Sequence, residues 1–172
     1  MSAPQRYLPE RPFPPYAYVP GRQPHPVRDP AGHSHGAPEP PAADPLAPDD
    51  WRASADFLYG VDLFNHGYYW EAHEAWEGLW RAAPDERARA MLHGLIKLAA
   101  AGVKLRAGNL RGVQRHADAA ADLFRPLAAE GRDRLYGLDP RALKESADEV
   151  AAAAAGEAVA AKSGLETVLR PE

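Results

Sequence analysis

The distribution of proline most constrains what this chain can fold into. Fourteen of the eighteen prolines lie in residues 1–48, where acidic and basic residues balance. Because proline lacks an amide hydrogen and breaks helices, we expect residues 1–48 to form an extended arm. Residues 49–155 then form the folded domain, and the alanine-rich residues 156–172 form a loosely ordered C-terminal tail.

The segment after residue 48 carries the periodicity of helices. Its apolar residues recur at spacings of three and four, and no stretch alternates as a strand does. Capping and breaking residues divide it into five helices. The first begins at Asp49 or Asp50 and ends near residue 66, and the others cover about 68–82, 85–107, 109–129 and 140 onward. The sequence therefore predicts an all-α protein: a single helical bundle of about five helices with an extended proline-rich N-terminal arm.

The second of these helices concentrates the polar chemistry. Residues 65–81 read N-H-G-Y-Y-W-E-A-H-E-A-W-E-G-L-W-R. At about 100° per residue, Trp76 lies on the apolar stripe, His73 lies at its edge, and Glu71 points furthest away. The i, i+4 spacing of His73 and Glu77 would let them share one metal ion or hydrogen-bond to each other.

We expect no serine or cysteine nucleophile motif, so histidine and carboxylate are the residue types left from which an active site can be built. His73 and Glu77 would supply two metal ligands from one helix, and His116 would supply a third from the fourth helix. Such ligands suit zinc, manganese or iron, and no other cofactor is predicted. With a metal-bound water, Glu74 or Glu77 would be the catalytic base of a hydrolase. Two alternatives stay open. One is a non-enzymatic binding or assembly module in which a structural His–Glu contact joins the tryptophans in a polar core, and the other is a metal-free acid–base site.

The arm has two interpretations. It contains His25, His33 and His35 as well as several aromatic residues. It is either a flexible segment with incidental histidines, or a segment that wraps around the domain and brings histidines to a site. The sequence leaves both open.

Charge is divided along the helical segment. Residues 49–86 contain nine acidic and two basic residues, whereas residues 87–117 contain seven basic residues and no acidic one. The simplest explanation is that the two halves face each other and pair. The acidic partners would then be Glu71, Glu74 and Glu77, and the basic partners Lys97, Lys104, Arg111 or Arg115. Alternatively, the start of the fourth helix forms an anion pocket from Asn109, Arg111 and Arg115.

Composition removes several classes of function. Without cysteine, the chain has no disulfide, thiolate zinc site or thiol nucleophile. A net charge of −4 predicts no general affinity for nucleic acid or membranes. The start of the sequence lacks the apolar run of a signal peptide, and no stretch is long and apolar enough to span a bilayer. We expect a cytoplasmic protein whose partner is a small molecule, another protein or a second copy of the chain in a homo-oligomer.

The run L-F-N-H-G-Y-Y-W-E-A-H-E-A-W-E-G-L-W, followed by G-L-I-K-L-A-A-A and R-A-G-N-L-R-G, resembles the family called domain of unknown function 309. The resemblance covers residues 56–127. It implies a small helical bundle in which the motif helix and the Gly-Asn turn face a common centre, and a metal-dependent hydrolase activity. Lys97 stands where related sequences frequently have glutamine, and a cation facing the site would weaken the metal assignment. The motif positions are Asn65, Gly67, Trp70, Glu71, His73, Glu74, Trp76 and Glu77, with Asn109 and Gly112 in the second turn.

Overall fold

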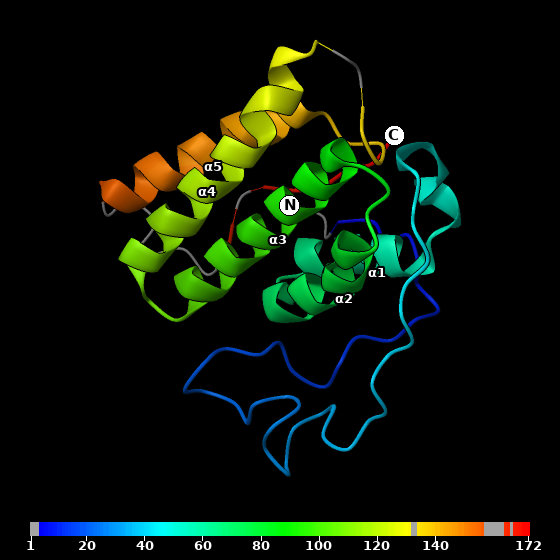
Figure 1. The fold of residues 1–172 in the computed structure, drawn as a ribbon. Coiled ribbons are helices and arrows are strands. Elements are labelled where there is room, and N and C mark those ends of the chain that lie inside the picture. Colours follow the sequence, from blue (N-terminus) through cyan, green and yellow to red (C-terminus); the bar gives the residue numbers. More distant parts are fainter. Residues whose placement is uncertain (1–3, 132–133, 157–163, 166) are drawn as a thin grey trace.

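The described part of the chain forms five α-helices and one 3-10 helix. The structure is a computed structural model that describes residues 4–131, 134–156, 164–165 and 167–172. No strand occurs within these ranges, so the predicted all-α class is confirmed. The elements are η1 (Pro48–Ala53), α1 (Ala55–Asn65), α2 (Tyr69–Arg81), α3 (Glu86–Arg106), α4 (Leu110–Ala129) and α5 (Pro140–Ala155) (Figure 1).

Side-chain caps begin most of the helices. Asp85 accepts a hydrogen bond from the Ala88 amide at the start of α3, and Asn109 and Asp139 do the same for α4 and α5. The prediction that the first helix begins at Asp49 or Asp50 is wrong. Those residues lie in the separate helix η1, which stops at Ser54. Ser54 is extended, and its side chain accepts from the Phe57 amide to cap α1.

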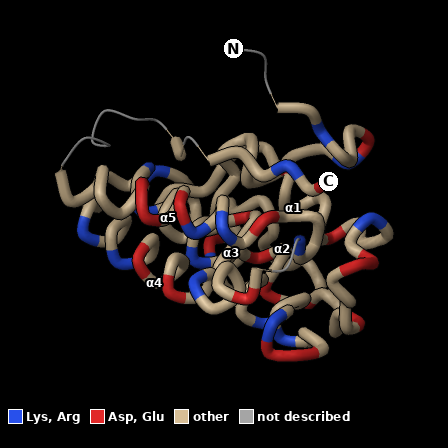
Figure 2. The backbone as a smooth tube through the Cα atoms, turned by 90° about the horizontal axis from the view of Figure 1, so that it is seen from above, with Lys and Arg blue, Asp and Glu red and all other residues tan. Residues whose placement is uncertain are grey.

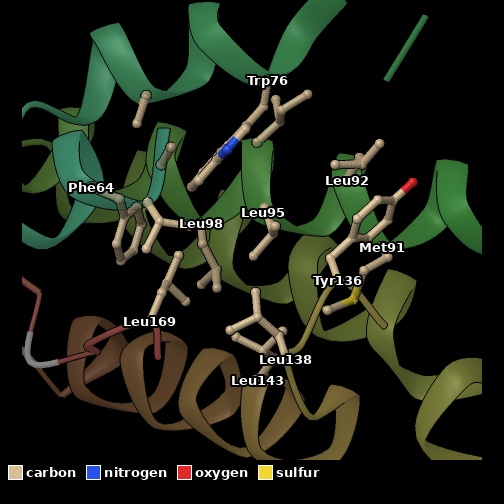
Figure 3. Packing of buried hydrophobic residues seen from close by; sticks show 14 of the residues in the cluster. Phe64, Trp76, Met91, Leu92, Leu95, Leu98, Tyr136, Leu138, Leu143 and Leu169 are labelled. Carbon is tan, nitrogen blue, oxygen red and sulfur yellow. The ribbon is translucent and has the colours of Figure 1, made fainter. Parts of the chain in front are cut away.

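The core lies between α1, α2, α3 and the segment that leads into α5 (Figure 3). Trp76 is fully buried at its centre, and its indole Nε1 donates to the Phe57 carbonyl over 3.2 Å. α3 packs against α2 and also against α4, and α5 packs on α4. Burial of each large apolar side chain contributes about 1.5–3 kcal/mol. Figure 3 labels the neighbours Phe64, Met91, Leu92, Leu95, Leu98, Tyr136, Leu138, Leu143 and Leu169.

The end of the chain packs on the bundle. Leu169 is 1% exposed, and the Asn65 side chain both donates to its carbonyl and accepts from its amide, each over 2.8 Å. Residues 167–172 therefore depart from the predicted loose tail, because a buried leucine and a paired backbone hold them. The part of that prediction that concerns residues 157–163 and 166 lies outside the described residues. Gly67 makes the expected sharp turn after α1, with a φ of 80°.

The arm wraps around α1 and α2, as one of its two interpretations predicted. Figure 1 shows it, blue to cyan, as an extended segment on that side of the bundle. The fully buried carboxylate of Asp62 accepts hydrogen bonds from the amides of Tyr7 and Leu8, over 2.8 and 2.9 Å. Further along, the Phe13 ring stacks on Tyr68 with centroids 4.8 Å apart. In the described part of the chain, no helix is long and apolar enough to cross a membrane.

Candidate functional site

Glu71 is the buried carboxylate of the motif helix, contrary to the prediction that it points furthest from the core. Only 6% of the residue is exposed, because the arm covers it. Its Oε1 accepts from the Tyr18 amide over 2.9 Å and lies 3.3 Å from His33 Nε2. The neighbouring Trp70 packs edge-on against the rings of Tyr18 and His25. The arm thus brings histidines to the motif helix, at Glu71 and Trp70.

The predicted metal ligands are not assembled. His73 Nδ1 lies 3.3 Å from Glu74, and Glu77 pairs with Arg81 over 2.8 Å. About a third of the His73 and Glu77 side chains is exposed, so these are surface contacts. Within the described ranges, no group of three or more His, Asp or Glu side chains is arranged to hold a metal ion. The described residues therefore do not bring His73, Glu77 and His116 together as a ligand set, and the assignment of Glu74 or Glu77 as a catalytic base stays a prediction.

The described residues do not show the ion pairs expected between the named acidic and basic partners, although Glu86 and Arg89 do pair across the two halves. Glu71 is bound by the arm, while Glu74 and Glu77 pair within α2. None of the ion pairs found among the described residues involves Lys97, Lys104, Arg111 or Arg115. Figure 2 shows where the basic residues lie along α3 and α4. These four positive charges therefore have no ion-pair partner among the described residues, whereas Arg87 and Arg89 of α3 do.

Three polar residues share one face of α3. His93, Lys97 and Lys104 lie within about 40° of each other around the helix axis, because they are spaced by four and seven residues. At one end, the Trp80 ring of α2 lies on His93 with centroids 4.9 Å apart. At the other end, the Lys104 stem lies against α4, where a Cβ on Gly112 would meet its Cγ at 2.8 Å. We call His93, Lys97, Lys104, Arg115 and His116 the basic face.

Burial and positive charge keep the two histidines of the basic face neutral. Burial is the main cause that lowers the pKa of His116 to about 4, followed by the charges of Lys97, Arg115, Lys104 and His73. Burial also lowers the pKa of His93, with Lys97 and His73 as further causes. No carboxylate contributes to either pKa shift. Lys97 therefore acts on both histidines, which remain neutral at pH 7 and retain one N–H donor each.

Beside this face, the indole Nε1 of Trp80 is buried and has no hydrogen-bond partner among the described residues. A buried donor without an acceptor costs free energy. The lysines, which have no ion-pair partner among the described residues, and the neutral imidazoles make the basic face itself rich in donors. Such a surface is chemically suited to an anion.

Protonation of His116 should contribute to the loss of folding stability in acid. Its folded-state pKa of about 4 is below the ordinary 6.5, so the unfolded chain takes up a proton first as the pH falls. We expect stability to be complete above about pH 6.5 and to decline between about pH 6.5 and 4. Urea unfolding across this range should show a weaker decline in His116→Asn. An unchanged pH dependence would contradict the burial of a neutral imidazole.

Of the residues predicted for an anion pocket, only Arg115 belongs to the basic face. Asn109 caps α4 by accepting from the Gly112 amide over 2.8 Å, and Arg111 is exposed. Only Arg115 acts on the basic face, through His116. Sequence reasoning gave Lys104 only a role in ion pairing and gave no binding role to His93, although the spacing of these α3 residues is plain in the sequence. Their shared face was the signal that could have found them.

Comparison with known protein families gives a match over part of the chain. Residues 57–116 match the model of a domain of unknown function, DUF309, which confirms the family that the motif predicted. The matched segment contains the motif helix, all of α3 and the five residues of the basic face. No curated protein and no solved structure matches the chain.

Proposed function

We propose that this chain, whose residues 57–116 belong to the DUF309 family, binds small acidic molecules on its basic face. The observation that carries the proposal is the position of Lys97. Its charge lowers the pKa of both His93 and His116, and it has no ion-pair partner among the described residues. A bound anion would supply the missing negative charge.

The spacing of the donors indicates the kind of anion. Lys97 and Lys104 are two helical turns apart, about 10 Å along the α3 axis, and their flexible four-carbon side chains can converge on one small molecule. One phosphate or carboxylate at Lys97 would also reach the neutral imidazoles, whereas Lys104 and Arg115 would receive a second acidic group. We therefore expect molecules with two anionic groups, such as pyrophosphate or citrate, to bind more tightly than inorganic phosphate.

Lys97→Ala should remove most of the binding. At low salt, pyrophosphate at about a hundred times its Kd would stabilise the wild-type protein by about 2.7 kcal/mol, measured as a rise in Tm. The variant should show little rise, and added salt should weaken the wild-type response because the interaction is electrostatic. Lys144→Ala is the matched control, since Lys144 lies on α5 and pairs with Asp148. A wild-type protein indifferent to phosphate, pyrophosphate and citrate would contradict the proposal, as would an unimpaired Lys97→Ala.

Metal-dependent hydrolysis is the activity that the family resemblance implies. We do not adopt it, because the histidines and carboxylates of the described residues do not form a ligand set. Metal analysis of the purified protein distinguishes the two functions. Stoichiometric zinc, manganese or iron that is lost in a His73→Ala, Glu77→Ala double variant would favour the hydrolase. Binding of pyrophosphate without any effect of added metal would favour the anion site.

A further inference from the structure

A serine-centred turn lies in the arm, away from the basic face. Residues 32–36 read G-H-S-H-G, which has the spacing G-x-S-x-G of many serine hydrolases, here outside any strand or helix. The expectation that the sequence has no serine nucleophile motif is therefore wrong. Gly32 is packed so closely that a Cβ would lie 2.3 Å from the carbonyls of His25 and Pro26. The Ser34 amide donates to the Pro26 carbonyl over 2.9 Å. Gly36 has a φ of 71°, so both glycines are required by the turn.

The turn places Ser34, His33 and Glu71 in one chain of contacts. His33 Nδ1 lies 2.8 Å from Ser34 Oγ, and His33 Nε2 lies 3.3 Å from Glu71 Oε1. The side chains of His33 and Glu71 are 6% and 5% exposed. Glu71 as a carboxylate can only accept, so His33 donates through Nε2 and accepts the Ser34 hydroxyl proton at Nδ1. Ser34 itself is partly exposed.

Glu71 is held in place for this arrangement. Its Oε1 also accepts from the Tyr18 amide, and its Oε2 is buried without a hydrogen-bond partner in the described part of the chain. A carboxylate whose charge is incompletely satisfied would stabilise an imidazolium that forms beside it. This is the part that the carboxylate plays in a serine–histidine–acid triad.

We propose that Ser34 is the nucleophile of an acyl-transfer site, with His33 as its general base and Glu71 as a positioning residue. Ser34 Oγ would form a bond to the carbonyl carbon of a small ester while its proton moves to His33 Nδ1. The bond from that carbon to the leaving oxygen would then break, and His33 would give the proton to this alkoxide, which departs as the alcohol. Attack by water would release the carboxylic acid and restore Ser34.

Two features limit the class of substrate. The two ring nitrogens exchange the parts that they play in the common triad, because the serine contacts Nδ1 and the carboxylate contacts Nε2. The turn lies on the surface of the arm, beside the ring of Tyr16, whose centroid is 4.8 Å from that of His33. We therefore expect small activated esters to react.

A fluorophosphonate probe on the full-length protein tests the proposal. The Ser34 oxygen should displace fluoride from phosphorus, and mass spectrometry of peptides should place the label on Ser34. Ser34→Ala should lose the label and the release of p-nitrophenol from p-nitrophenyl acetate. Ser146→Ala should keep both, because Ser146 lies on α5, where its hydroxyl bonds to Thr167. Failure of pyrophosphate to bind would leave these results unchanged, since the two sites share no residue.

Glu71→Gln tests the positioning residue, because glutamine can still accept from His33. The rate of labelling should fall by about 10²-fold, and the acid limb of the pH–rate profile should move to lower pH. His33→Gln should abolish labelling while the melting curve shows a folded protein. A folded wild-type protein that is not labelled at Ser34, or is labelled at another serine, would overturn the proposal.

Discussion

Replacing Asp62 with alanine should lower the free energy of unfolding by about 3 kcal/mol. Asp62 is fully buried in α1, yet its partners belong to the arm. Without its carboxylate, the amides of Tyr7 and Leu8 would lose their acceptors. Arg6 Nε, which lies 3.5 Å away in an ion pair without hydrogen-bond geometry, would lose its counter-charge.

Asp56→Ala is the matched control on the same helix. Asp56 also contacts the arm, through Arg11 over 3.0 Å, but its side chain is 63% exposed. An exposed ion pair contributes about 0–1 kcal/mol, so the control should remain near the wild-type stability. Urea denaturation of the two variants measures the difference. Equal stabilities would show that the arm contributes little to the fold.

Gly60→Ala should destabilise the bundle by about 3 kcal/mol. α1 and α2 approach so closely at this residue that a Cβ would lie 2.1 Å from Trp76 Nε1. The indole is fully buried and cannot move aside without disturbing the core or its hydrogen bond to Phe57.

Gly78→Ala should have the opposite effect on stability from Gly60→Ala. Gly78 lies inside α2. The atom nearest to an added Cβ would be the Cβ of Ala43, at a van der Waals distance of 3.6 Å. Because alanine favours helix over glycine by about 1 kcal/mol, this variant should be more stable than wild type. Thermal unfolding by circular dichroism compares the pair. A Gly60→Ala variant as stable as Gly78→Ala would contradict the packing of Trp76 on α1.

The helical scaffold was predictable because its signals are local. The capping residues Asp85, Asn109 and Asp139 stand directly before their helices. The apolar residues of each helix also recur at helical spacing within the helix itself. The start of the first helix was predicted wrongly because two local capping signals compete there. Asp49 and Ser54 are both good caps, and only the packed structure shows that Ser54 begins α1.

The burial of Glu71 was not predictable from its own helix. Periodicity compares a residue with its neighbours along α2, and by that measure Glu71 faces solvent. Its cover comes from Tyr18 and His33, which are 53 and 38 residues away in the sequence. A proline-rich segment has no periodicity that would reveal which face of the bundle it covers.

The basic face was partly visible in the sequence. The spacing of His93, Lys97 and Lys104 places them together, but the acidic residues of the preceding half offered plausible partners. The structure shows that those carboxylates are bound by the arm, by His73 and by Arg81. Whether Lys97 and Lys104 have ion-pair partners thus depends on the whole fold, because the fold decides where each acidic side chain binds.

The most direct test of the basic face follows its histidines by NMR during a titration with pyrophosphate. The imidazole signals of His93 and His116 should move, and the pKa of His116 should rise from about 4, because a bound anion offsets the charges of Lys97 and Lys104. The signals of His35, which is exposed in the arm, should stay in place. Stationary signals from His93 and His116, or equal movement of all histidines, would contradict an anion site on this face.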